Sequence, residues 1–229
     1  MTPSSTASVL YGCAVIAALC IVASIPKPVV ALSSGTATKR EYDLVVVGGG
    51  SAGLTAAKFA RTFSKSAVII EAERMGGDCT WYGCVPSKSI IAAAKAAHAA
   101  RTASARFGVD ASVSDKIDMK KVMATVRAKM DHIYEEDDSP AAMTKLGIDT
   151  MSGKATLVSP KEVVVGDITV VAKEGIVLAT GAKPRKPTGI EGLDSVPYMT
   201  YEDVWNLETL PASMTIVGGG PVRVFPLRQ

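Results

Sequence analysis

Residues 42–59 read YDLVVVGGGSAGLTAAKF, and this stretch decides the fold. An apolar run, Leu44–Val47, leads directly into Gly48-Gly49-Gly50-Ser51-Ala52-Gly53, and a helical pattern follows. A second β-branched run, Ala67–Ile70, ends at Glu71. A strand, a turn, a helix and a second strand of these lengths predict a right-handed crossover between two parallel strands.

Three glycines form the pattern G-x-G-x-x-G between that strand and that helix: Gly48, Gly50 and Gly53. The first permits the tight turn, the second leaves room for a pyrophosphate against the backbone, and the third lets helix and strand pack. The helix N-terminus adds N–H donors and a favourable dipole. Glu71, at the tip of the second strand, can accept hydrogen bonds from ribose hydroxyls, which favours FAD or NAD over NADP. The pattern predicts a dinucleotide site and leaves FAD and NAD both open.

Further helices are expected beyond this unit. One is Ala-rich and runs from Ser87 to about Phe107. The other has apolar residues every three to four positions and runs from Asp118 to Glu136. Ser139-Pro140 reads as an N-cap followed by proline at the first helical position, opening a short helix. The acidic residues 135–138 are expected at a solvated helix end, and residues 202–210 form a weak helix.

From Ile148 the period changes to two, which predicts short strands. Gly166-Asp167 turns one pair of them, and Thr180-Gly181 follows the last. Residues 213–221, SMTIVGGGP, repeat the pattern of a strand leading into glycines. The fold class is therefore α/β: a Rossmann-like parallel sheet with helices, plus a small antiparallel β-meander.

Composition excludes several partners. The chain has 229 residues, 48% hydrophobic and 21% charged, as in an ordinary globular protein. Its net charge of +3 includes no block of Lys or Arg, so nucleic acid and acidic membrane surfaces are not implied.

The N-terminus carries an apolar run, Val9–Ile25, that is broken by Pro26-Lys27-Pro28. We expect residues 1–31 to be a cleavable signal or targeting leader, with an uncleaved membrane anchor as the alternative. Residues 32–41 are a polar linker. The leader predicts entry into the secretory pathway or an organelle.

Two of the four cysteines, Cys13 and Cys20, lie in the leader, whereas Cys79 and Cys84 lie in GGDCTWYGCVPSK, residues 76–88. In a regular helix Cα atoms five residues apart are ~8.7 Å from one another. A disulfide needs less than about 7 Å. A bonded pair therefore requires a break in the helix, for which the neighbouring glycines give the freedom.

A structural disulfide, half of a zinc site and a redox couple are the three possible roles for this pair. Zinc takes four ligands, and His98 and His132 stand alone on helical stretches, where we read them as surface or helix-packing residues, so no metal site is expected. A structural disulfide would close a tiny loop and remove little chain entropy. A helix beginning near Ser87 would lower the pKa of a thiolate, which favours the redox couple.

The glycine fingerprint followed by GGDCTWYGCVPSK resembles the class I pyridine nucleotide–disulfide oxidoreductases, over roughly residues 41–221. Together with HIYEEDD at 132–138, it is most similar to the mercuric-reductase-like branch. The resemblance implies that electrons pass from NAD(P)H through FAD to a disulfide and on to substrate. Cys84 would be the flavin-proximal thiol of a charge-transfer complex, Cys79 the interchange thiol, and Lys88 a cation near the flavin.

The resemblance also implies a set of cofactor-binding residues, which would contact the FAD pyrophosphate, ribose and flavin. They are Gly48, Gly50, Ser51, Ala52, Gly53, Glu71, Gly77, Lys88, Gly153, Thr180 and Gly181. Gly153 lies in SGKATLV, which is similar to a flavin-contact strand, and Thr180-Gly181 lie in an ATG motif.

The resemblance implies an FAD-binding domain at 42–212 and an incomplete start of an NAD(P)H-binding domain at 213–229. Arg223 stands where a third fingerprint glycine is expected, and Pro226 would break the helix there. We therefore expect an N-terminal fragment of a redox-homeostasis enzyme that acts on a small-molecule disulfide or metal ion and is a homodimer when complete. The alternative is a non-catalytic or weakly redox-active FAD-binding module.

Overall fold

The computed structural model of the chain describes residues 38–110, 117–218 and 220, which belong to one compact unit, Ser34–Gln229. The predicted leader, residues 1–31, lies outside the described residues, as do Arg223 and Pro226. None of the helices within these ranges is long and apolar enough to cross a membrane.

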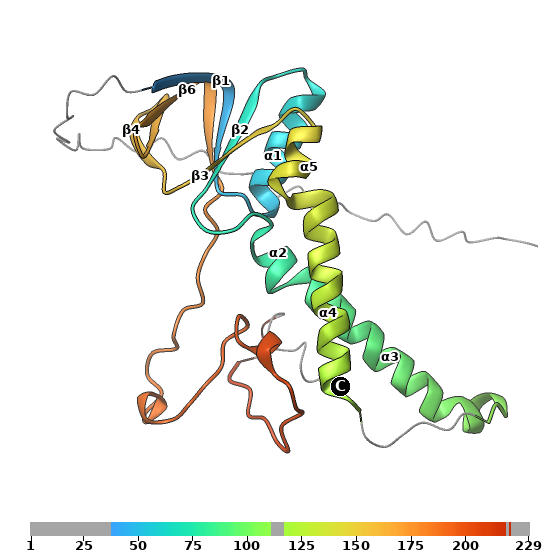
Figure 1. Ribbon diagram of the computed structural model, residues 1–229. Helices are drawn as coiled ribbons and strands as arrows, with labels where there is room; N and C mark the ends of the chain where they lie inside the picture. Colours follow the sequence, from blue (N-terminus) through green and yellow to red (C-terminus); the bar gives the residue numbers. More distant parts are fainter. Residues whose placement is uncertain (1–37, 111–116, 219, 221–229) are drawn as a thin grey trace, which may run out of the picture. The chain divides into compact units, whose positions relative to one another are not determined.

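Six strands form one mixed sheet in the order β3-β2-β1-β6-β5-β4 (Figure 1). Neighbours from β3 to β6 pair in parallel, and β6, β5 and β4 pair antiparallel. Both the predicted parallel sheet and the predicted meander are confirmed, and β6 belongs to both. The strands are β1 (Thr38–Val47), β2 (Ala67–Glu71), β3 (Asp149–Ser152), β4 (Thr156–Ser159), β5 (Glu162–Val165) and β6 (Ile168–Leu178).

Strand β6 is a long strand, whereas the alternating pattern predicted short ones. Its first half pairs with β5 and with Thr38–Tyr42, and its second half pairs with Leu44–Val47. Strand β1 therefore begins inside the expected linker, because residues 38–41 find a partner in β6. A register shift between Tyr42 and Leu44 accommodates the change from one half to the other. The predicted turn at Gly166-Asp167 connects β5 to β6.

Five α-helices and three short turns of helix complete the described residues. Helix α4 ends at Ile133, before the predicted Glu136, and the chain continues as a π-helical turn. The expected weak helix at 202–210 is a single 3-10 turn. The elements are α1 (Ser51–Thr62), α2 (Gly77–Trp81), α3 (Cys84–Phe107), α4 (Met119–Ile133), η1 (Tyr134–Asp138), α5 (Pro140–Lys145), η2 (Leu193–Ser195) and η3 (Val204–Asn206).

The central strands bury side chains on both faces, which explains their uninterrupted apolar sequence. Val46 and Ile69 pack on one face against residues of α1 and α5, such as Leu54 and Met143. Alternate residues of the same strands form a second cluster on the other face with β5 and β6. These are Tyr42, Val45, Val47, Val68, Ile70, Val163, Val165, Val170 and Ala172.

The π-helical turn changes the environment of the acidic run. Glu135, Glu136 and Asp137 are exposed as expected, but the solvated end predicted for Asp138 is wrong. Asp138 is buried and accepts a hydrogen bond from Thr80 Oγ1 at 2.5 Å. The wider turn, closed by Ser139 N–H donating to Tyr134 O, directs the last acidic side chain inward.

Ser139 caps α5 as predicted, because its Oγ accepts a hydrogen bond from Ala142 N at 3.1 Å. By contrast, residues 213–218 form no strand, although their sequence predicts one. These residues are mostly exposed and pair with no strand of the described sheet, and an isolated apolar segment gains nothing from an extended conformation without a partner.

We predict that Ile69→Ala lowers the free energy of unfolding by about 2–5 kcal/mol, because it leaves a cavity beneath α1. Ile69 is 0% exposed, whereas Ile190, the matched control, is 40% exposed in a loop. Ile190→Ala should change stability by no more than about 0.5 kcal/mol. Urea denaturation followed by circular dichroism measures both, and equal losses would contradict the assignment of the core.

Candidate functional site

The parallel strands end at one edge of the sheet, and the predicted cofactor-binding residues other than Gly77 and Lys88 lie at or just after these ends. Gly48 comes after β1, Glu71 closes β2, Gly153 comes after β3 and Thr180-Gly181 come after β6. Backbone hydrogen bonds of 2.7–2.8 Å join neighbouring ends, with Gly153 N–H donating to Glu71 O as one example. Between β1 and β6 the strand order reverses, which is where open α/β sheets bind ligands.

The glycine loop is shaped by contacts that leave no room for side chains at two positions. Gly48 has φ +107°, and a Cβ there would lie 2.2 Å from Ala179 O. A Cβ on Gly53 would lie 1.9 Å from Gly48 O. At Gly50 the nearest atom to such a Cβ is Gly77 Cα at 3.6 Å, an ordinary contact. The loop therefore needs glycine at positions 48 and 53 in order to fold. At position 50 the fold itself would tolerate a side chain, so glycine there would serve the close approach of a ligand.

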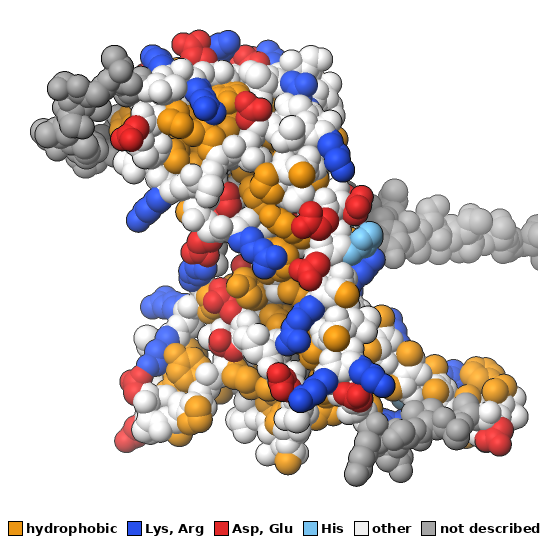
Figure 2. All heavy atoms as spheres, viewed as in Figure 1, with side chains coloured by type: hydrophobic (Ala, Val, Ile, Leu, Met, Phe, Trp, Pro, Cys, Tyr) orange, Lys and Arg blue, Asp and Glu red, His pale blue; other side chains and the backbone are white. Residues whose placement is uncertain are grey.

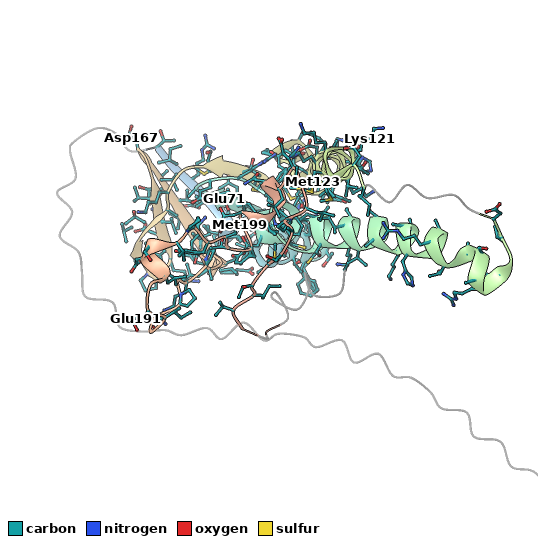
Figure 3. All side chains as sticks on the ribbon, turned by 90° about the horizontal axis from the view of Figure 1, so that it is seen from below. Glu71, Lys121, Met123, Asp167, Glu191 and Met199 are labelled. Atoms are coloured by element: carbon teal, nitrogen blue, oxygen red, sulfur yellow. The ribbon has the colours of Figure 1, made fainter. Side chains whose placement is uncertain are left out.

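Glu71 supports the loop directly. Its Oε2 accepts a hydrogen bond from Gly49 N at 2.5 Å, and its Oε1 accepts one from Glu73 N at 2.8 Å. The side chain, labelled in Figure 3, is half-buried at the end of β2. Sequence reasoning gave Glu71 a ribose-binding role and missed this contact, in which the same carboxylate fixes the backbone of the loop.

The cysteine motif meets the glycine loop backbone to backbone. Gly77, the first residue of α2, has φ +57°, and a Cβ there would lie 2.6 Å from Gly50 Cα. Gly76 N–H also donates to Gly49 O at 2.8 Å. Cys79 follows two residues later in α2. The loop and the cysteines, predicted separately from two motifs, are therefore parts of one site.

The two cysteines lie on either side of a break between helices, as predicted for a pair that can bond. Cys79 belongs to α2 and Cys84 is the first residue of α3, with Tyr82 and Gly83 between the helices. A Cβ on Gly83 would lie 2.9 Å from Asp78 O, so glycine is needed there. The predicted start of the second helix near Ser87 is three residues late, because Pro86 is tolerated in a first turn.

Both thiols are free in the structure. A hydrogen bond with Cys79 raises the pKa of the Cys84 thiol, and burial and the negative charge of Cys79 raise it further. The Lys88 ammonium, one turn along α3, lowers it but does not prevail. A backbone hydrogen bond at Cys84 also lowers the pKa, as expected for a helix start, but the raising contributions outweigh it in the dithiol.

An aromatic contact, which sequence reasoning missed, packs α2 against η1. The buried Trp81 packs 5.2 Å from the Tyr134 ring, and the Arg74 guanidinium lies 3.1 Å from the centroid of Trp81. Tryptophan between two redox-motif cysteines is the signal that could have indicated this, since a large ring there needs a packing partner.

Other classes of site find no support in the described part of the chain. No group of three or more His, Cys, Asp or Glu is arranged there to hold a metal ion. His98 and His132 are exposed on α3 and α4, as the surface reading expected. Figure 2 shows basic and acidic side chains interspersed over the visible face, with no continuous basic surface.

We predict that Gly48→Ala destabilises the fold by about 2 kcal/mol or more, since alanine at φ +107° is strained and its Cβ meets Ala179 O. Gly175→Ala is the matched control, because nothing lies within 4 Å of a Cβ there. Its stability should stay unchanged or rise by up to about 1 kcal/mol. Thermal unfolding compares the two variants, and a stable Gly48→Ala chain would contradict the loop geometry.

We further predict that Cys79→Ala lowers the pKa of Cys84, because the substitution removes the hydrogen bond and the charge that raise it. Lys88→Gln should have the opposite effect and raise that pKa. The rate of iodoacetamide alkylation at Cys84, followed against pH by mass spectrometry, reports the thiolate fraction. A shift in the same direction in both variants would be inconsistent with this electrostatic arrangement.

Comparison with known proteins adds independent findings to this geometry. The family described as pyridine nucleotide-disulphide oxidoreductase matches residues 42–224. The chain is 32% identical over 202 residues to dihydrolipoyl dehydrogenase of Bacillus subtilis (strain 168), covering 80% of this chain and 40% of that protein. It is 33% identical over 185 residues to mercuric reductase of Streptomyces lividans, with 79% and 38% covered.

A soluble pyridine nucleotide transhydrogenase of Mycobacterium bovis (strain BCG / Pasteur 1173P2) is 30% identical over 193 residues, with 81% of this chain and 40% of that protein covered. The chain thus spans about two fifths of the length of these relatives. The family is FAD-dependent, and NAD(P)H is the substrate of its full-length members. The match covers most of the chain and includes the glycine loop, the cysteine pair, the second part of β1 and all of β2 to β6, so the chain belongs to the pyridine nucleotide-disulphide oxidoreductase family.

Proposed function

We propose that this chain provides the FAD-binding and dithiol–disulfide part of an NAD(P)H-dependent disulfide reductase. The observation that carries the proposal is the contact between Gly50 and Gly77, which places the glycine loop against the helix that carries Cys79. A dinucleotide bound along the loop would therefore end beside the cysteine pair. Such adjacency is what electron transfer between the two requires.

The residues at the carboxyl edge fit the FAD pyrophosphate. Helix α1 begins at Ser51, and its N-cap residue, Gly50, has no side chain to occupy the first-turn N–H groups. These N–H donors and the helix dipole favour a diphosphate. Gly50 adds no side chain beside them, and no acidic side chain lies in the first turn. Glu71 would serve the ribose, and Gly77, Gly153, Thr180 and Gly181 would border the remaining length of the cofactor.

When bound, FAD would supply two-electron transfer between NAD(P)H and a disulfide. Cys84, at the start of α3, would be the thiol next to the flavin, and Cys79 would be the thiol that exchanges with substrate. The hydrogen bond with Cys79 raises the pKa of Cys84, which favours the protonated thiol at this position in the dithiol. Lys88 would offer a positive charge to an anionic partner.

The activity of the whole protein forms part of the proposal, because the relatives are more than twice as long as the matched region. We propose a small-molecule disulfide or a metal ion as substrate, by analogy with the relatives, and a homodimer as the complete assembly. We also propose that residues 1–31 direct the chain into the secretory pathway or an organelle. A non-catalytic or weakly redox-active FAD-binding module is the alternative.

Gly50→Ala separates cofactor binding from folding. The Cβ would meet only Gly77 Cα at 3.6 Å, and Gly50 has an extended backbone that alanine adopts, so the variant should fold normally. The same Cβ would occupy the place of the pyrophosphate. We predict that FAD affinity falls by about tenfold or more, the loss expected when charge-assisted hydrogen bonds are lengthened.

Quenching of flavin fluorescence on titration with the full chain measures the affinity, with Gly175→Ala as the matched control that should bind like the parent. Equal FAD affinity in the parent and Gly50→Ala, or no binding to the parent, would contradict the proposed cofactor site. Binding of FAD without formation of a Cys79–Cys84 disulfide would favour the non-catalytic FAD-binding module.

A further inference from the structure

A distant segment of the chain contacts both ends of the cysteine-bearing helix α2. The Tyr201 hydroxyl donates to Asp78 Oδ2 at 2.7 Å, and the Trp205 Nε1–H donates to Tyr82 O at 3.0 Å. Asp78 immediately precedes Cys79, and Tyr82 lies between the two cysteines. Each hydrogen bond joins residues 123 positions apart in the sequence. The two donor residues are four positions apart, and so are the two acceptor residues, which is about one helical turn.

The Tyr82 carbonyl needs a partner that its own helix cannot provide. In a continuous helix it would accept from the residue four positions later. That residue is Pro86, which has no N–H. The indole of Trp205 supplies the missing donor, so the break between α2 and α3 carries no unsatisfied carbonyl at this point.

Both donors are held in place. Trp205 is 7% exposed and packs against Met123 and Val126 of α4, with Met123 labelled in Figure 3. Burial, the hydrogen bond to Asp78 and the charge of Asp78 raise the pKa of Tyr201. The hydroxyl therefore stays protonated and donates its hydrogen bond to the Asp78 carboxylate. The turn that carries it is closed by Thr200 N–H and Oγ1–H donating to Asp203 Oδ2, each at 2.8 Å.

We propose that Tyr201 and Trp205 are positioning residues for the Cys79–Cys84 couple, an inference that rests on the proposed redox function. By fixing the two ends of α2 they hold the helix break open. A regular helix would separate the cysteine Cα atoms by ~8.7 Å, beyond the reach of a disulfide. The two hydrogen bonds therefore raise the effective concentration of one thiol at the other and favour the disulfide over the dithiol.

The equilibrium with dithiothreitol tests this directly. In it, the two protein thiols and oxidised dithiothreitol exchange two electrons and two protons to give the protein disulfide and reduced dithiothreitol. The full chain is equilibrated in buffers of graded ratio, quenched with acid, alkylated and digested with trypsin. Trypsin cleaves after Arg74 and after Lys88, which releases one peptide, residues 75–88. This peptide contains Cys79 and Cys84 and excludes Cys13 and Cys20. Its mass distinguishes dithiol from disulfide.

We expect Tyr201→Phe and Trp205→Phe each to shift the equilibrium constant toward the dithiol by about three- to tenfold, as expected for the loss of one hydrogen bond. Both substitutions keep a ring in place. Tyr198→Phe removes a tyrosine hydroxyl from an exposed side chain outside this contact and is the matched control, which should leave the constant unchanged. A merely structural role would lower the midpoint of thermal unfolding without moving this constant.

Two outcomes overturn the inference, and they differ in what else they overturn. If the parent forms the disulfide and both variants share its equilibrium constant, the positioning role is wrong and the redox function stands. If peptide 75–88 of the parent stays a dithiol at every ratio, the proposed redox function fails, and the positioning role fails with it.

Discussion

The close approach of backbone segments at the carboxyl edge of the sheet is the constraint on which the site depends. Gly48 lies against Ala179, Gly53 against Gly48, and Gly77 against Gly50. A methyl group at Gly48, Gly53 or Gly77 would overlap backbone atoms, so these segments can meet only through glycine. Because α2 is brought to the loop in this way, the cysteines acquire a fixed place beside it.

The break between the cysteines depends on a second constraint, which works against regular structure. Gly83 takes a backbone position where a side chain would overlap Asp78 O, and Pro86 removes the donor that would extend a helix through Tyr82. Each of these features costs helix stability on its own. The loss is offset by contacts from elsewhere in the chain, with Asp138 bound to Thr80 and Trp205 bound to Tyr82.

The sequence was sufficient wherever the determinant was local. Periodicity and the glycine pattern predicted β1, α1, β2 and the meander, because strand alternation and loop sterics act over a few residues. The Trp205 and Asp138 contacts were missed because their partners are 123 and 58 residues away. The direction of the pKa change at Cys84 was also missed, since it depends on how closely the second thiol approaches, and spacing in the sequence does not give that distance.

The candidate site can be tested with residues of this chain alone. All parallel strand ends, both cysteines and the residues that brace α2 lie within the described residues. Thiol–disulfide exchange at Cys79 and Cys84 needs only these, whereas delivery of electrons from NAD(P)H needs a second dinucleotide site. The dithiol–disulfide equilibrium and the FAD affinity therefore test this part of the protein directly.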